Sequence, residues 1–433
     1  MRGTDPYVPG HGDGSYGVTH YDLTLSYRPA GNRIDGLAVL ACVAHEEVTA
    51  LSLDLHHLRV AKVSVSRGGA VRSTHRSGAV RVTLSSPIAA GEEFTVTVKY
   101  SGSPVPVPSP SLGEAGWEEL EDGAIVAAQP HGAPSWFPCN DRPDDKATYS
   151  ITVSAPQEYH VAVSGELVSS TRGGSTVTWA YEQRSPMATY LATVQIGRYV
   201  VRQQPAEVPM RVVIPPDLRG AGFDASFGRQ PEMMAFFVDR FGPYPFPSYT
   251  VVITDDDLEI PLESQSLSTF GRNFARDDWD AIRLVAHELA HQWFGNAVTL
   301  RQWRDIWLHE GFACYAEWLW SEESGGQTAA EWAEHHHQKL SDLPQDLLLG
   351  DPGPDLMFDD RVYKRGALTL HALRLRIGED AFFDVLRAWV ARHKGGSVDT
   401  ADFVSLCDRI SGESLIDLFE SWLGKAELPS LSA

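Results

Sequence analysis

Val285-Ala286-His287-Glu288-Leu289-Ala290-His291-Gln292-Trp293-Phe294 is the stretch around which the rest of this 433-residue chain is organised. It contains the pattern His-Glu-x-x-His, and residues four apart share one face of a helix, so His287 and His291 should point the same way. Two imidazoles at that spacing can bind one zinc ion, and Glu288 then stands where it can accept a proton from an attacking water. The apolar spacing predicts a helix that stops at Gly295-Asn296 and whose N-terminus is favoured by Asp277, Asp278 and Asp280.

A third ligand for the metal is available further along the chain. Glu310 lies in Trp307-Leu308-His309-Glu310-Gly311-Phe312-Ala313, with eighteen residues between it and His291. That gap allows one helix to end and a second helix to return beside it. Two histidines, a glutamate and an open fourth position are typical of a catalytic zinc site rather than a structural one. We therefore expect one zinc ion per chain, bound by His287, His291 and Glu310.

This combination of motifs resembles the gluzincin pattern of the M1 family of zinc aminopeptidases, and the resemblance extends over nearly the whole chain. It implies hydrolysis of the N-terminal residue from peptides that have a free N-terminus. The ending Phe419-Glu420-Ser421-Trp422-Leu423 resembles the close of the family's catalytic domain. The resemblance therefore implies a short form, without the helical C-terminal domain of longer members.

The pattern of the chain predicts a multidomain α+β protein. Residues 1–202 alternate apolar and polar positions in short runs such as Tyr21 to Tyr27 and Phe94 to Tyr100, which is typical of half-buried strands. We expect an N-terminal all-β, sandwich-like domain there. Residues 203–433 contain a few strands, a helix expected from about Ala225 to Phe241, and then mostly helical patterns. This second part is expected to be a thermolysin-like, mostly helical catalytic domain with a small sheet, as the resemblance implies.

Composition restricts the partners and the compartment. The formal net charge of -21 disfavours nucleic acid and anionic membranes as partners. Four scattered cysteines without a Cys-x-x-Cys pair suit a reducing compartment and no disulfide framework. The chain shows neither a signal-peptide core nor an apolar run of about 18 residues, so we expect a soluble cytoplasmic protein. The oligomeric state does not follow from the sequence.

The resemblance implies roles for two further residues in the reaction. Tyr363, in Val362-Tyr363-Lys364-Arg365-Gly366-Ala367, matches the family tyrosine whose hydroxyl stabilises the oxyanion of the tetrahedral intermediate. Glu317 lies seven residues after Glu310, on the same face of the expected helix. It matches the acid that holds the other nitrogen of a ligand histidine, a partner that metal-bound histidines usually need.

The resemblance also implies how the free amino group of a substrate is bound. Glu263, in Ile260-Pro261-Leu262-Glu263-Ser264, matches the carboxylate of the family's Gly-x-Met-Glu-Asn strand, and Gln129 matches a position that lines the pocket for the first residue. Ile260 and Pro261 depart from that strand. Because proline has no N–H, one hydrogen bond to the substrate should be missing or moved. Glu263 is the expected anchor, and Glu259 is the less favoured alternative to it.

Three other features of the sequence could suggest a metal ligand or a nucleophile, and we expect none of them to have either role. His309 replaces the asparagine that commonly precedes the ligand glutamate, and we expect its side chain to pack behind the ligands or to be structural, and not to be a ligand. Cys139, in Trp136-Phe137-Pro138-Cys139-Asn140-Asp141-Arg142-Pro143, is expected to be a buried small hydrophobe. His335-His336-His337 lies in a polar helical stretch and points in three directions, so we expect a solvated face.

Two alternatives to an aminopeptidase remain open from the sequence. A zinc endopeptidase could use the same metal site, although Glu263 would then be an unpaired charge when a peptide binds by its middle. A non-catalytic scaffold could retain the fold, although such proteins usually lose a ligand or the base. In this chain His287, Glu288, His291, Glu310 and Tyr363 are all present.

Overall fold

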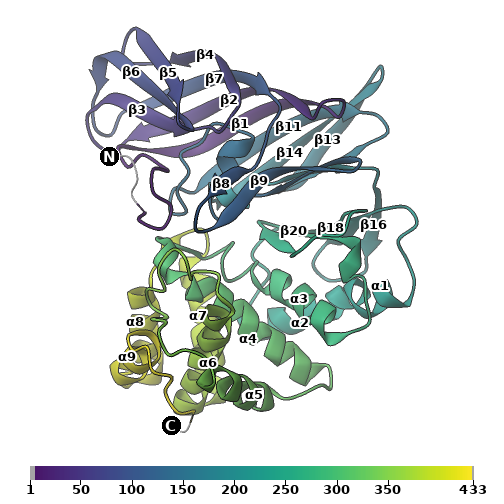
Figure 1. Ribbon diagram of the computed structural model, residues 1–433, viewed down its shortest axis with the longest axis vertical. Helices are drawn as coiled ribbons and strands as arrows, with labels where there is room; N and C mark the ends of the chain where they lie inside the picture. The colour runs from purple at the N-terminus through teal and green to yellow at the C-terminus, as the bar shows by residue number, and fades with distance from the viewer. Residues whose placement is uncertain (1–4, 432–433) are drawn as a thin grey trace. The chain divides into compact units, whose positions relative to one another are not determined.

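The computed structural model describes residues 5–431, which form two compact units (Figure 1). The first unit contains the chain up to Arg202 together with Arg211–Asp217 and Ser248–Phe270. The second contains Gln203–Met210, Leu218–Pro247 and the chain from Gly271 onward. The chain thus first passes from one unit to the other after Arg202, and two later segments belong to the first unit again.

The first unit is built from sheets. Its longest sheet contains, from edge to edge, β13 (Glu166–Gly173), β14 (Thr176–Met187), β11 (Ala147–Pro156), β1 (Tyr16–Arg28), β2 (Arg33–Ala44), β7 (Glu93–Gly102) and β4 (Arg59–Val65). A second sheet contains β12 (His160–Val163), β15 (Val194–Gly197), β10 (Gly123–Ala127), β9 (Gly113–Leu120) and β8 (Val107–Ser109). A third contains β3 (Val48–Asp54), β6 (Ala79–Ile88) and β5 (Val71–Arg76). The small sheet contains β16 (Val200–Gln204), β17 (Met210–Ile214), β18 (Tyr249–Ile253), β20 (Leu267–Phe270) and β19 (Leu262–Ser264).

The alternating pattern of the sequence explains how the central strand is placed. In β1, Tyr21, Leu23 and Leu25 are buried, whereas Asp22 and Thr24 between them are exposed. Successive side chains of a strand point to opposite faces, so this strand buries one face and leaves the other to solvent. It pairs antiparallel with β2 and parallel with β11. The predicted all-β N-terminal part is confirmed.

The segment Trp136 to Pro143 is anchored in the interior of this unit. Trp136, Phe137 and Cys139 are fully buried, and the backbone of Cys139 exchanges hydrogen bonds of 2.7 and 3.0 Å with Asp54. The Phe137 ring packs edge-on against Tyr21, with 5.5 Å between the centroids. Burial raises the pKa of the Cys139 thiol well above its ordinary value, so its environment suits a core residue and not a nucleophile.

The second unit is built mainly from helices. They are α1 (Ala221–Ala225), α2 (Gln230–Phe241), α3 (Trp279–Ala290), α4 (Trp307–Glu323), α5 (Ala329–Ser341), α6 (Asp360–Ile377), α7 (Glu379–His393), α8 (Thr400–Ser411) and α9 (Ile416–Leu423). A short parallel pair joins β21 (Thr299–Leu300) to β22 (Ser397–Val398). The helix expected from Ala225 begins only at Gln230, because a 3-10 turn, Phe227–Arg229, precedes it and Pro231 occupies its first turn.

Two glycines let α4 and α6 approach closely. A Cβ atom added to Gly311 would lie 2.7 Å from the Gly366 Cα, and one added to Gly366 would lie 2.7 Å from the Gly311 Cα. Both contacts are with backbone atoms, so neither helix can accept a side chain at this point without moving. The crossing lies one residue after Glu310 and three residues after Tyr363, and it therefore fixes the two site-bearing turns against each other.

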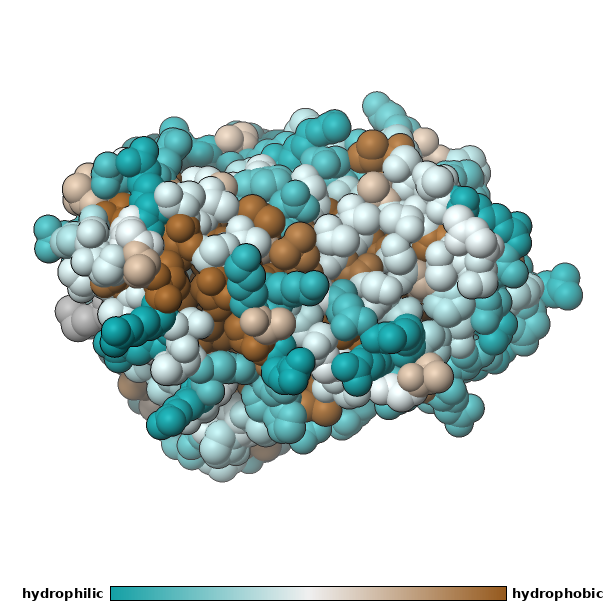
Figure 2. Space-filling model, turned by 90° about the horizontal axis from the view of Figure 1, so that it is seen from above, coloured by the Kyte–Doolittle hydropathy of each residue, from teal (hydrophilic) through white to brown (hydrophobic). Residues whose placement is uncertain are grey.

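The surface mixes polar and apolar side chains. Figure 2 shows one face, on which hydrophilic residues are interspersed with apolar ones. Among the described apolar residues, Ile260 at 68% and Ile416 at 61% are the most exposed large side chains. Within residues 5–431, the structure contains no helix with both the length and the apolar character that a membrane crossing requires.

Candidate active site

The His-Glu-x-x-His stretch lies at the C-terminal end of α3. The Asp278 carboxylate caps the start of this helix by accepting the Ala281 N–H at 3.0 Å. The helix ends at Ala290, yet the His291 N–H still donates to the His287 carbonyl at 3.1 Å. Both imidazoles therefore remain on one face, with 4.7 Å between their ring centroids.

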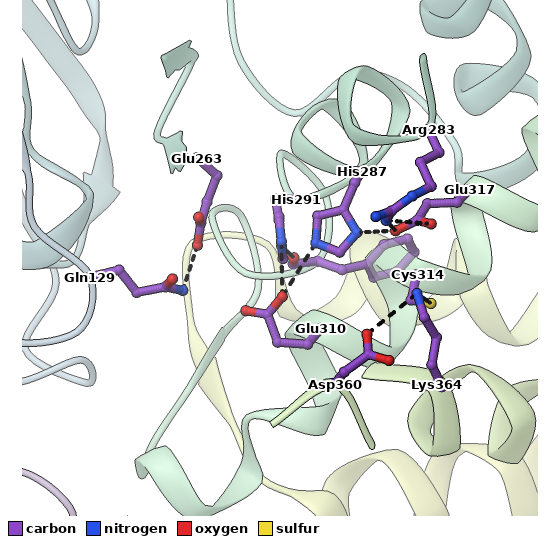
Figure 3. A network of polar contacts seen from close by, with 11 residues as sticks. Gln129, Glu263, Arg283, His287, His291, Glu310, Cys314, Glu317, Asp360 and Lys364 are labelled. Carbon is purple, nitrogen blue, oxygen red and sulfur yellow. Dashed lines mark hydrogen bonds and ion pairs between the residues drawn. The ribbon is translucent and has the colours of Figure 1, made fainter. Parts of the chain in front are cut away.

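Glu310, in the first turn of α4, lies opposite the two histidines. Its Oε2 is 3.4 Å from His287 Nε2 and 3.3 Å from His291 Nε2 (Figure 3). One donor atom from each of the three side chains lies within 4.8 Å of the others, and all three residues are buried. Burial acts to raise the pKa of Glu310, but the two imidazoles hold it well below its ordinary value.

The donor set fits a zinc ion. Ligand atoms about 2.0–2.2 Å from one zinc in a tetrahedral arrangement lie about 3.4 Å from each other, which matches the distances to Glu310. The outer nitrogens are also engaged: His287 Nδ1 donates to Glu317 Oε1 at 2.7 Å, and His291 Nδ1 donates to the Phe294 carbonyl at 3.0 Å. Each imidazole thus presents the lone pair of Nε2 to the shared point.

Glu317 belongs to a buried network that sequence reasoning found only in part. Arg283, one turn before His287 on α3, donates to Glu317 Oε2 at 3.3 Å. Burial acts to raise the pKa of Glu317, but Lys364, His287 and Arg283 lower it to about 2. Sequence reasoning missed Arg283 and Lys364. The available signals were the four-residue spacing of Arg283 from His287 and the position of Lys364 next to Tyr363.

Glu288 is buried beside the ligands. Burial raises the pKa of its carboxyl above the ordinary value, and the nearby His287 and His291 partly oppose this shift. A carboxyl group in such surroundings is suited to accept a proton and later to donate it.

Tyr363 reaches the site from the first turns of α6. Asp359 caps this helix by accepting the Arg361 N–H at 2.9 Å. The Tyr363 ring stacks near the His287 ring, with 5.9 Å between centroids and 23° between planes. The structure therefore brings Tyr363 to a ligand histidine, although the two residues are far apart in sequence.

In the first unit, the structure brings Gln129 and Glu263 together. Gln129 Nε2 donates to Glu263 Oε1 at 2.7 Å (Figure 3). Glu263 lies on β19 and is only 2% exposed, whereas Glu259 is exposed. Of the two candidate acids, Glu263 is thus the one held in a defined, buried position. The loop before it exposes Ile260 and buries Pro261.

Two histidine predictions have different outcomes. His309 is buried, and its Nε2 accepts the Leu300 N–H at 2.9 Å, so it serves the packing of α4 as expected. The expectation of a solvated face for His335 to His337 is wrong for His336. Its ring is buried between Trp318 and Trp332, at centroid distances of 5.3 and 5.7 Å. The reason is helical spacing, since His336 lies on the buried stripe of α5 with Ala329, Ala333 and Leu340.

Comparison with protein families identifies the chain. The model of the peptidase M1 N-terminal domain matches residues 18–191, and that of the peptidase family M1 domain matches residues 225–422. The chain belongs to peptidase family M1. The family resemblance carried by the sequence motifs is thereby confirmed, and so is the expected α+β fold.

Individual M1 proteins show how far the similarity extends. The chain is 27% identical to Aminopeptidase M1 of Arabidopsis thaliana over 73% of this chain and 38% of that protein. It is 29% identical to Aminopeptidase N of Streptomyces lividans over 67% of this chain and 36% of that protein. The chain thus spans well under half the length of these two M1 relatives.

A solved M1 structure matches from end to end. The M1 zinc metallopeptidase from Deinococcus radiodurans is 32% identical, covers 100% of both chains and has a TM-score of 0.90. A mutant of it bound to a Tyr-Ser-Ala substrate is 33% identical, with a TM-score of 0.91 and the same coverage. These M1 structures are of zinc enzymes, and the donor set described above suits that metal, so we assign zinc as the cofactor.

Proposed function

We propose that this protein is a zinc aminopeptidase, which releases the N-terminal residue of peptides by hydrolysis of the first peptide bond. The observation that carries the proposal is the convergence of His287, His291 and Glu310 on one point, with Glu288 buried beside them. When bound there, zinc polarises the scissile carbonyl and lowers the pKa of a water ligand towards about 7.

The residues of the chain then perform the remaining steps. Glu288 accepts a proton from the attacking water and passes it to the leaving amine. Tyr363 donates its hydroxyl hydrogen to the oxyanion that develops on the former carbonyl oxygen. Glu317 keeps His287 in the tautomer whose Nε2 faces the metal.

Specificity for the end of a peptide is assigned to Glu263 and Gln129. The Glu263 carboxylate is buried and accepts a hydrogen bond from Gln129, and its negative charge suits the ammonium group of a substrate N-terminus. The relative bound to a Tyr-Ser-Ala substrate supports peptides as the substrate class, and the free N-terminus is the part of the proposal that rests on Glu263. An endopeptidase is disfavoured, because a peptide bound by its middle supplies no charge to this carboxylate.

The proposed setting is the cytoplasm. All four cysteines are free, buried thiols, which is typical of proteins in a reducing compartment. The acidic net charge of -21 supports the proposal that neither nucleic acid nor an anionic membrane is a partner.

A pair of matched peptides tests the proposal. We expect a peptide with a free N-terminus to lose residues one at a time, as followed by mass spectrometry, and its N-acetylated twin to remain intact. A chelator should abolish the activity, and added zinc should restore it. Equal cleavage of the acetylated peptide would establish the endopeptidase instead. No cleavage of either peptide, with less than about half an equivalent of zinc bound, would establish the scaffold.

A further inference from the structure

Lys364 is a buried cation whose position is not explained by packing alone. It is only 8% exposed, although lysine is rarely buried without a charged partner. Its Nζ lies 3.4 Å from the Cys314 sulfur and 3.9 Å from Asp360 Oδ1 (Figure 3). The Asp360 side chain is 78% exposed, so solvent screens that contact and it cannot account for the burial of the ammonium.

The charged and titratable groups that interact electrostatically with Lys364 come from four helices. They are Arg283 of α3, Cys314 and Glu317 of α4, His336 of α5, and Asp360 of α6. Burial keeps the Cys314 thiol protonated, with a pKa raised to about 12, so it carries no charge. Glu317 is therefore the one buried anion among these described neighbours, with a side chain only 3% exposed. The ammonium of Lys364 is balanced mainly by that carboxylate.

Glu317 has two cations to balance it, and they differ in character. Arg283 donates a hydrogen bond to the Glu317 carboxylate at 3.3 Å. The Arg283 side chain is 30% exposed and also forms an ion pair with Asp280 at 3.8 Å. Lys364 is buried, and its Nζ donates to the Cys314 sulfur, one turn before Glu317 on the same helix. A fixed charge in a water-poor site acts more strongly than one that solvent screens. Lys364 is thus placed to hold the Glu317 carboxylate in position.

The position of Lys364 in the sequence links this network to the reaction. It directly follows Tyr363 on α6, and successive residues of a helix point in directions about 100° apart. One helical turn therefore brings Tyr363 near the His287 ring and Lys364 to the Cys314 sulfur, one turn before the Glu317 that accepts the His287 Nδ1–H.

We propose that Lys364 is a positioning residue for the metal site. Its ammonium fixes Glu317 as the acceptor of the His287 Nδ1–H, and this contact sets the orientation and electron donation of His287 as a zinc ligand. The inference rests on the proposed function only in taking zinc as the metal. Its test therefore measures zinc affinity and not peptide hydrolysis.

The test compares zinc dissociation constants, measured by competition with a chromophoric chelator, for the full chain and its variants. Lys364→Met should raise the zinc Kd by about 10- to 100-fold, the range typical of lost partners of metal ligands. Lys364→Arg, which keeps the charge, should stay within about threefold of the wild type. Lys339→Met on the exposed face of α5 makes the same change of charge away from the site and should leave the Kd unaltered. A Lys364→Met protein with the wild-type Kd would overturn the proposal, even if its Tm fell.

A second comparison keeps the proposal testable if Lys364→Met does not fold. The pair Glu317→Gln and Lys364→Met/Glu317→Gln removes the buried carboxylate first, so the lysine no longer balances it. If Lys364 acts through Glu317, the two proteins should have zinc Kd values within about threefold of each other. A further tenfold loss in the double variant would show that Lys364 acts by another route. An inactive wild-type protein would refute the aminopeptidase and leave these Kd comparisons unchanged.

Discussion

Replacing Gly366 by alanine tests whether the close crossing of α4 and α6 sets the geometry of the active site. The new Cβ would lie 2.7 Å from the Gly311 Cα, whereas non-bonded carbons pack best at about 3.5–4.0 Å. The helices would have to separate by about 1 Å. The overpacking should cost about 1–3 kcal/mol, partly offset by about 1 kcal/mol from the higher helix propensity of alanine. The fold should therefore survive with a modest loss of stability.

The activity of Gly366→Ala should fall much further than its stability. Gly311 follows the ligand Glu310 and Gly366 lies one turn from Tyr363, so the separation displaces these two groups relative to each other. A misplacement of about 1 Å in a catalytic arrangement can cost about 100-fold in rate. We expect kcat to fall by about that factor while KM changes little, as measured on a peptide or an aminoacyl reporter substrate together with Tm.

Gly228→Ala is the matched control for this experiment. A Cβ at Gly228 would lie 3.5 Å from its nearest neighbour, the Phe223 carbonyl oxygen, which is an ordinary contact. This variant should keep the wild-type kcat. A Gly366→Ala protein with wild-type kcat and Tm would refute the reasoning, since it would show that the two helices do not constrain Tyr363.

Three further variants test individual roles. Glu288→Gln should keep its zinc and lose several orders of magnitude in kcat, because an amide cannot accept the proton from water; metal analysis combined with kinetics checks this, and full activity would remove Glu288 from the reaction. Glu263→Ala should lower the ratio of kcat/KM for free over N-acetylated peptides, whereas an unaltered ratio would move the anchor to Glu259. Asp54→Asn tests stability against pH, because burial raises the pKa of Asp54 from 3.8 to about 6. Between about pH 4 and 6 the folded protein keeps a proton that the unfolded chain has lost, so this carboxyl removes up to about 3 kcal/mol of stability as the pH rises. The Asp54→Asn protein should lack this contribution to the pH dependence of stability. Plots of Tm against pH that run parallel for the variant and the wild type would contradict the assignment.

The parts of the site that the sequence predicts well are those fixed by local geometry. The separation of His287 and His291 follows from the helical repeat, and the third ligand follows from a second helix that returns after a short connection. Strand alternation in the first two hundred residues likewise reports which side chains face a core. These are short-range rules that need no knowledge of how distant segments pack.

The remaining features depend on contacts between distant segments. Gln129 and Glu263 are 134 positions apart, and their hydrogen bond exists only because a loop after β10 meets β19 in the folded unit. His336 looked solvated because its neighbours in sequence are polar, but its surroundings are decided by Trp318 of another helix. Lys364 shows the same limit. Its sequence position gives no sign of burial, whereas the fold buries it against the Cys314 sulfur of another helix.

Three consecutive residues of α6 contact three different parts of the fold, so the geometry of the site depends on the position of this helix. Tyr363 lies near the His287 ring, and Lys364 donates to the Cys314 sulfur, one turn before Glu317 on α4. Arg365 donates to the carbonyls of Trp422 at 3.0 Å and of Ala426 at 2.7 Å, close to the end of the chain. Any slide of α6 along α4 would change all three sets of contacts together. The close approach of the two backbones at Gly311 and Gly366 lies within one turn of the three residues, where it opposes such a slide.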